Sequence, residues 1–251
     1  MRILLTNDDG ILAPGLKALE KIARKLSKDI WVVAPEYEQS GASHSLTLTQ
    51  PLRVRRVNSR KFAVRGTPTD CVIMAIDTIM RGFRPDLILS GVNRGGNLGE
   101  DVTYSGTIAA AMEGTLLGIP SIALSQNFVH QHPVKWATAE HHAPLVIRKL
   151  LKAGWPKDVL VNVNFPDVVH AQVGAVEVVR QGKRDLTDLV IDDRIDARGV
   201  PYYWIGFRRQ VGKLADDTDL GVIARGGISV TPLQLDLTHR STLSKLRSAF
   251  A

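Results

Sequence analysis

The chain has 251 residues, of which 44% are hydrophobic and 23% charged, as is typical of a globular protein with room for one α/β domain and an appendage. Its formal net charge of +7 favours phosphorylated ligands or nucleic acid as partners. No apolar run approaches the roughly 18 residues of a transmembrane helix, the start lacks the hydrophobic segment of a signal peptide, and the single cysteine excludes an internal disulfide. We therefore expect a cytoplasmic protein with no membrane contact.

Strand-like and helix-like segments alternate through the first 165 residues. In chain order, apolar runs predict strands at 2–6, 30–34, 87–89, 121–124 and 159–163, and helical spacing predicts helices at 16–26, 69–79, 107–117 and 134–151. A period-two pattern over 46–64 predicts short antiparallel strands. Thr69 is the expected cap of the second helix, and residues 91–106 form a predicted glycine-rich loop. This alternation favours a Rossmann-like, mostly parallel α/β sheet with helices on both faces.

The pattern becomes less regular after Pro166. Strands are predicted around Val176 and Val178 and at 202–207 and 228–231, and a terminal helix at 241–250. The charged stretch 180–198 predicts a hairpin or arm that leaves the main body. We expect a single domain over 1–251, with an α/β core at 1–170 and a β-rich C-terminal extension at 171–251 that carries the arm and a returning strand.

Polar segments follow three of the predicted strands. The first is Asn7-Asp8-Asp9-Gly10, the second is Ser40-Gly41-Ala42-Ser43-His44-Ser45, and the third runs from Ser90 to Gly99 and leads through Ser105-Gly106-Thr107 into a helix. Ligands of open α/β sheets collect at the carboxyl ends of strands, and a glycine-rich helix N-terminus binds anions. Each segment also has an interpretation without a ligand: the first as a plain Asp-Asp-Gly turn, the second as a flexible serine-rich connection and the third as a long surface loop.

Together these segments supply carboxylate, hydroxyl and amide oxygens, a ligand set that suits Mg²⁺ or Mn²⁺ better than zinc. The histidines elsewhere have no metal-binding spacing with Cys or Glu and are predicted to lie at the surface: His130, His132, His141 and His142. His44 and residues 105–107 are candidates to assist proton transfer or to orient a phosphate. If a bound phosphate ester is hydrolysed here, we favour direct attack of water on phosphorus over attack by Asp8. Phosphatases that form an aspartyl-phosphate have one residue between their two carboxylates, whereas Asp8 and Asp9 are adjacent.

A basic cluster supports a competing interpretation. Its members are Arg53, Arg55, Arg56, Arg60, Lys61 and Arg65, which form either a solvated strand face or a rim that attracts phosphate. A nucleic-acid-binding protein without hydrolytic activity is the alternative function, but only Phe62 offers a stacking ring inside the cluster. A dinucleotide-dependent dehydrogenase is excluded, because no glycine fingerprint follows the first strand.

Several motifs together resemble the stationary-phase survival protein SurE family of metal-dependent nucleotidases. They are Ile3-Leu4-Leu5-Thr6-Asn7-Asp8-Asp9-Gly10, Ala13-Pro14-Gly15-Leu16, the segment from Ala34-Pro35 through Ser40 to Thr47, Gly66-Thr67-Pro68-Thr69-Asp70-Cys71, residues 90–114, Asn162-Val163-Asn164-Phe165-Pro166, and Thr218-Asp219 with Ser229-Val230-Thr231-Pro232-Leu233. They span nearly the whole chain in order. The resemblance implies hydrolysis of nucleoside 5′- and 3′-monophosphates, and in some members of short polyphosphate.

The resemblance also implies roles for single residues. Asp8, Asp9, Ser40 and Asn93 correspond to the ligands of one divalent cation per subunit, Mg²⁺ or Mn²⁺. Asn97, Ser105, Gly106 and Thr107 correspond to residues near the substrate phosphate, with His44 beside them. The catalytic set is thus Asp8, Asp9, Asn97, Ser105 and Thr107. The family exchanges its C-terminal extension between subunits, so a homodimer or homotetramer is expected, with nucleoside monophosphates as substrates and nucleic acid an unlikely partner.

Overall fold

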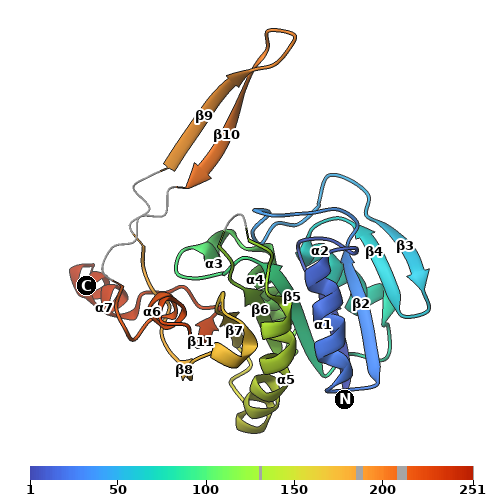
Figure 1. Cartoon of the computed structure of the whole chain (residues 1–251), viewed down its shortest axis with the longest axis horizontal. Helices are drawn as coiled ribbons and strands as arrows, with labels where there is room; N and C mark the ends of the chain where they lie inside the picture. The colour runs from blue at the N-terminus through green and yellow to red at the C-terminus, as the bar shows by residue number, and fades with distance from the viewer. Residues whose placement is uncertain (130–131, 185–188, 208–213, 251) are drawn as a thin grey trace.

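The computed structural model describes residues 1–129, 132–184, 189–207 and 214–250. In these parts of the chain, a nine-stranded sheet has the order β3-β4-β2-β1-β5-β6-β7-β11-β8 (Figure 1). Its strands are β1 (Arg2–Thr6), β2 (Asp29–Pro35), β3 (Arg53–Asn58), β4 (Lys61–Arg65), β5 (Leu87–Arg94), β6 (Ser121–Gln126), β7 (Val159–Phe165), β8 (Val176–Val178) and β11 (Ile228–Gln234). Strands β4, β2, β1, β5, β6 and β7 are parallel neighbours, whereas β3 and β11 pair antiparallel with β4 and β7. The predicted mostly parallel sheet is confirmed.

Helices cover both faces of this sheet. One core cluster joins α1 (Pro14–Arg24) and α5 (Trp136–Ala153) to side chains such as Leu5. On the opposite face, α2 (Pro68–Met74), the π-helical turn η1 (Ala75–Ile79) and α4 (Gly106–Leu116) pack against side chains such as Leu4. Consecutive residues of a strand point to opposite faces, and a strand buried on both faces reads as a continuous apolar run.

The cap of α2 differs from the sequence prediction. Thr67, not Thr69, precedes the helix: its side chain accepts a hydrogen bond from the Asp70 N–H at 3.1 Å, and Asp70 Oδ2 accepts one from the Thr67 N–H at 2.8 Å. This reciprocal capping box places Pro68 at the first helical position, where its missing N–H costs nothing. Thr69 is buried inside the first turn.

Three further predictions need correction. The loop predicted from residue 91 begins later, because β5 shifts its register between Ser90 and Asn93 and then pairs with β6 up to Arg94. A short helix, α3 (Asp101–Tyr104), lies inside that loop. The period-two pattern gives strands only from residue 53 onward; residues 46–52 form none, and Leu48 is 84% exposed. The sequence also missed α6 (Asp219–Ala224).

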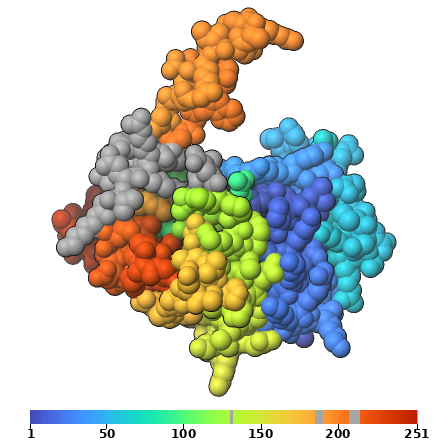
Figure 2. Space-filling view, viewed as in Figure 1, coloured from blue at the N-terminus to red at the C-terminus, as the bar shows by residue number. Residues whose placement is uncertain are grey.

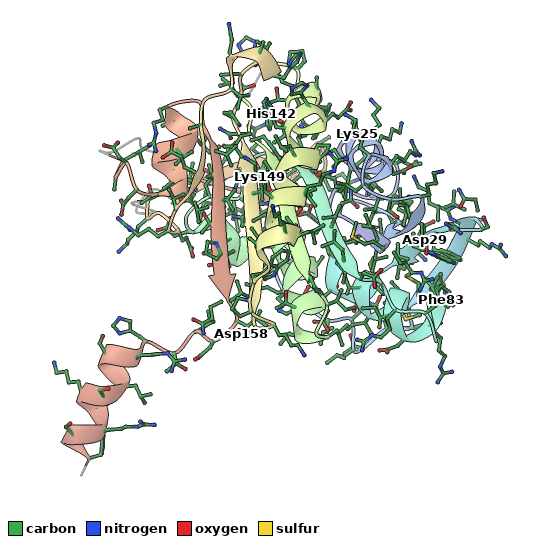
Figure 3. All side chains as sticks on the ribbon, turned by 90° about the horizontal axis from the view of Figure 1, so that it is seen from below. Lys25, Asp29, Phe83, His142, Lys149 and Asp158 are labelled. Carbon is green, nitrogen blue, oxygen red and sulfur yellow. The ribbon has the colours of Figure 1, made fainter. Side chains whose placement is uncertain are left out.

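The C-terminal extension contributes both to the sheet and to an arm. Strands β11 and β8 complete one edge of the sheet, with the short helix η2 (His170–Gln172) before them. Strands β9 (Leu189–Ile195) and β10 (Pro201–Phe207) form an antiparallel hairpin that projects from the body (Figures 1 and 2). The last helix, α7 (Arg240–Ala249), also stands away from the sheet (Figure 3). The predicted β-rich arm is therefore present. None of the helices in the described ranges has the length and hydrophobicity to cross a bilayer.

A buried carboxylate ties the root of this arm to the main body. Asp219 is fully buried. It accepts hydrogen bonds from the backbone N–H groups of Gly99 at 2.9 Å, Gly182 at 2.7 Å and Leu220 at 2.7 Å. Arg184 adds a 2.9 Å hydrogen bond to the carbonyl oxygen of Leu98. Three segments that are far apart in the sequence therefore share one acceptor.

We predict that Asp219→Ala lowers the free energy of unfolding by at least about 3 kcal/mol, because each of the three buried N–H groups left without an acceptor costs roughly 1–3 kcal/mol. Urea unfolding followed by circular dichroism measures the change. Asp217→Ala, which removes an exposed carboxylate paired with Arg180, is the matched control and should cost less than about 1 kcal/mol. Equal losses for the two variants would contradict the role assigned to Asp219.

Candidate active site

The turn after β1 places two carboxylates at the carboxyl edge of the sheet. Gly10 has a φ of +97°, a conformation that side chains other than glycine rarely adopt. The turn is held by a 3.0 Å hydrogen bond from Asn7 Nδ2 to the Gly10 carbonyl oxygen. The Gln39 N–H donates to the Asp8 carbonyl oxygen at 2.8 Å. The first and second polar segments of the sequence are therefore in direct contact.

The N-terminus of α4 brings the third segment to Asp8. Asp8 is 4% exposed. Both the backbone N–H and the hydroxyl of Thr107 donate hydrogen bonds to its carboxylate. Ser105 caps the helix, accepting a 3.1 Å hydrogen bond from the Ile108 N–H. A Cβ at Gly106 would lie 2.8 Å from the Asp8 Cβ, so only glycine allows this approach. The positive end of the helix dipole thus faces the carboxylate.

Asp9 lies beside residues of the second and third segments. Its Oδ2 accepts a 3.2 Å hydrogen bond from the backbone N–H of Arg94. Ser40 donates from its hydroxyl to Glu38 Oε1 at 2.9 Å. These four residues line one cavity of about 690 Å³. Glu38 adds a third carboxylate that the sequence analysis did not select.

Burial and nearby negative charge disfavour the ionised forms of Asp8 and Asp9. Burial raises the pKa of Asp8, although the hydrogen bonds from Thr107 oppose this. Burial, and then the charge of Asp8, raise the pKa of Asp9 to about 6. Glu38 raises both pKa values further. A concentration of negative charge of this kind is relieved by a bound cation.

The donor atoms present fit a hard cation. Asn93 uses its Nδ2 to donate to the Gly95 carbonyl oxygen at 2.9 Å, so the amide oxygen is the atom that it offers to a ligand. The Asn7 side-chain oxygen is buried and has no hydrogen-bond partner among the described residues. In the same parts of the chain, no group of three or more His, Cys, Asp or Glu residues is arranged to hold a metal. A cation here depends on two carboxylates together with hydroxyl and amide oxygens, as Mg²⁺ and Mn²⁺ allow.

Asn97 lies in a buried amide network. Its backbone N–H donates to Asn164 Oδ1 at 2.8 Å, and its Nδ2 donates to Ser125 Oγ at 2.8 Å. Its carbonyl oxygen accepts from Asn162 Nδ2 at 2.8 Å. The Asn97 side chain, which the sequence predicted to lie near the substrate phosphate, is therefore hydrogen-bonded inside the protein, and the network fixes the loop that leads to α4.

His44 occupies the other side of the α4 N-terminus. Its Nε2 lies 2.9 Å from Glu113 Oε2, and with Ser105 it lines a second cavity of about 770 Å³. Of the four histidines predicted to lie at the surface, His132 and His141 are exposed and His142 is partly exposed; His130 lies outside the described residues.

Comparisons with known proteins identify the family to which the chain belongs. Residues 3–188 match the family model described as survival protein SurE. The chain belongs to the SurE family. It is 60% identical over 250 residues to a protein of Paramagnetospirillum magneticum named 5′-nucleotidase SurE, covering 100% of this chain and 96% of that protein. A Parvibaculum lavamentivorans protein of the same name is 61% identical over 251 residues, covering 99% and 91% of the two chains.

A solved structure extends the likeness to three dimensions. The crystal structure of the SurE protein from Aquifex aeolicus superimposes with a TM-score of 0.85 at 39% sequence identity, covering 100% of both chains. The fold of the whole chain is therefore that of the family, with its predicted α/β core and C-terminal β arm.

We predict that, in EDTA, Asp9→Asn is more stable than the wild-type protein at pH 7.5 and that the difference shrinks toward pH 4.5. A folded pKa near 6 lies above the unfolded value of about 3.9. The stability contributed by protonated Asp9 is thus full below about pH 4 and lost as pH rises through 6, by about 2–3 kcal/mol. The asparagine keeps an acceptor for the Arg94 N–H.

Urea unfolding at the two pH values measures this difference. Asp77→Asn, at an exposed position, is the control and should show no such pH dependence. A difference between wild type and Asp9→Asn that is the same at both pH values would show that the Asp9 charge is not penalised in the folded protein.

Proposed function

We propose that this protein is a divalent-metal-dependent phosphomonoesterase that hydrolyses nucleoside 5′-monophosphates to nucleoside and phosphate. The observation that carries the proposal is the contact between Asp8 and Thr107, which joins the Asp8–Asp9 carboxylate pair to a helix N-terminus. One element is suited to a cation and the other to a phosphate. Relatives about 60% identical are named 5′-nucleotidases. Hydrolysis of 3′-monophosphates and short polyphosphate is proposed from the family resemblance alone.

The proposed cation is one Mg²⁺ or Mn²⁺ per subunit, held by Asp8, Asp9, Ser40 and Asn93. When bound, it would neutralise charge on the phosphoryl group and lower the pKa of a bound water. The two carboxylates supply the charge, and Ser40 and Asn93 supply neutral oxygens. This set leaves positions on a six-coordinate ion for water and a phosphate oxygen.

The chain's own residues orient the substrate. The N-terminus of α4 at Gly106, with the helix dipole, binds phosphate oxygens, while the Thr107 N–H already donates to Asp8. Thr107 holds Asp8 through two hydrogen bonds, which keeps that carboxylate a ligand rather than a nucleophile, so water is the attacking group. Asn97 holds the loop, and Ser105 completes the phosphate site as the helix cap. His44, oriented by Glu113, is the candidate to move a proton on the Ser105 side.

The nucleic-acid-binding alternative has little support in the structure. Much of the basic cluster is paired with acids: Arg55 with Glu36 at 2.8 Å, Arg60 with Asp29 at 3.1 Å and Lys61 with Glu20 at 2.6 Å. The residues of β3 are all exposed. Of the two interpretations of the basic cluster, these pairings favour the solvated strand face. Its positive charge attracts nucleotides in general but does not select among them.

The arm supports a homo-oligomer. Tyr203 is 63% exposed, Trp204 62% and Ile205 71%. An isolated two-stranded hairpin is marginally stable in water, and exposed apolar patches of this kind mark interaction surfaces. We propose a homodimer or homotetramer in which residues 171–251 serve assembly and residues 1–170 form the catalytic core of a single domain. Cytoplasmic location stays a prediction of the sequence.

The proposed activity is tested by phosphate release from AMP with Mg²⁺ or Mn²⁺. We expect hydrolysis that EDTA abolishes and added metal restores. Asp9→Asn should lower metal affinity at least about tenfold, because it removes one of two charges from the site, while Asp77→Asn leaves affinity unchanged. Hydrolysis that is insensitive to EDTA, or an unaltered metal titration in Asp9→Asn, would contradict the assignment.

Assembly is tested by light scattering at micromolar concentration, where we expect a mass above that of one 27.5 kDa chain. Trp204→Glu should shift the protein toward monomer, because a charge replaces an apolar contact. Asp193→Asn, at an exposed position of the other strand, should not. A wild-type monomer with full activity would contradict the proposed assembly.

A further inference from the structure

The cavity beside Asp9 has two chemically different ends. Asp9, Glu38 and Ser40 line its polar end, and Phe128 and Trp136 bring aromatic rings to the same cavity. Phe128 follows β6, and Trp136 is the first residue of α5. The aromatic side chains therefore come from a part of the chain that supplies none of the proposed metal ligands.

Phe128 is close to the proposed metal ligand Asn93. A Cβ built on Gly95 would lie 3.9 Å from Phe128 Cε1 and 4.0 Å from Asn93 Nδ2, so a single glycine separates the ring from the amide. The Arg94 guanidinium carbon lies 5.1 Å from the centre of the Phe128 ring. The same residue donates its backbone N–H to Asp9. Arg94 thus connects the carboxylate end of the cavity to its aromatic end.

Trp136 is held in place by the core. It packs against the cluster formed by α1, α5 and the sheet. If residue 15 had a side chain, its Cβ would lie 3.1 Å from Trp136 Cη2 and would also clash with the Val92 carbonyl oxygen. Because Gly15 has no side chain, the indole lies directly over the start of α1. A ring fixed in this way is a preorganised surface for a flat ligand.

We propose that the aromatic end of this cavity, formed by Phe128 and Trp136 with Arg94, is the nucleobase-binding subsite; this rests on the proposed function. Bases stack on aromatic rings with little dependence on base identity. A volume of about 690 Å³ lies within the range of small-molecule sites, about 300–1,000 Å³. The positive charge of Arg94 favours an anionic nucleotide over a free nucleoside.

The second cavity does not offer the same chemistry. It lies at His44 and Ser105, and the residues that line it include Met112, Leu233 and Leu237 but no Phe, Tyr or Trp. The aromatic ring at this cavity among its described lining residues is the His44 imidazole, which is held by Glu113. The aliphatic side chains can cover a base but cannot stack on it. The second cavity lies at the α4 N-terminus, and the first lies beside Asp9, whose neighbour Asp8 contacts that N-terminus. Of the two, the first is the cavity that offers Phe and Trp rings to a base.

The test compares substrates with and without a base. In the metal-loaded full chain, Phe128→Leu removes the ring and keeps an apolar side chain. We expect KM for AMP and GMP to rise about tenfold, with kcat within about twofold and KM for ribose 5-phosphate unchanged. Phe128→Tyr, which keeps a ring, should retain the wild-type KM for AMP. Met112→Leu, in the second cavity, is the matched control and should change neither substrate.

Binding of free adenosine, measured by calorimetry, separates this inference from the proposed function, because adenosine has no phosphate. Wild-type protein should bind it about tenfold more tightly than Phe128→Leu. Absence of AMP hydrolysis with intact, Phe128-dependent adenosine binding would remove the proposed function and leave the subsite. AMP hydrolysis with equal effects of Phe128→Leu on AMP and ribose 5-phosphate, or a selective loss of AMP binding in Met112→Leu, would overturn the subsite.

Discussion

The two hydrogen bonds from Thr107 to Asp8 join the first strand of the sheet to the helix that begins about 100 residues later. Burial alone would drive the Asp8 carboxylate to its neutral form, and these donors oppose that effect. They require α4 to start in contact with the end of β1, which Gly106 permits by having no side chain. This contact fixes the position of Ser105 and of the proposed phosphate site at the start of α4.

A second layer of buried polar groups supports that contact. Asn97, Asn162, Asn164 and Ser125 exchange hydrogen bonds under the loop, and Asp219 collects three backbone N–H groups from the loop and from the root of the arm. Removal of one member of such a network leaves other buried polar groups without their partners, which costs stability. The C-terminal extension is therefore part of the support of the candidate active site, and not an appendage that could be removed without effect.

Charge is distributed on two scales. The whole chain carries a net charge of +7, which attracts anionic substrates from solution. The candidate site is locally acidic: burial and the charge of Glu38 raise the pKa of Asp8, and burial and the charges of Asp8 and Glu38 raise that of Asp9. A phosphate would be repelled by this centre unless a cation stood between them. The combination of a basic surface, an acidic centre and a helix N-terminus is physically consistent with a metal-dependent phosphatase.

The sequence by itself determined the sheet and the residues at its edge. Continuous apolar runs predict strands buried on both faces. Asp8-Asp9-Gly10 follows such a run and Ser105-Gly106-Thr107 opens a helix, so local sequence patterns were enough to place both segments at the edge of the sheet. Tertiary structure decided what these residues touch. The register shift in β5, the proximity of Glu38 to Asp9, the aromatic end at Phe128 and Trp136 and the acceptor role of Asp219 depend on contacts between segments far apart in the chain. Such contacts leave no periodic signal, because they arise only when the sheet and helices have packed.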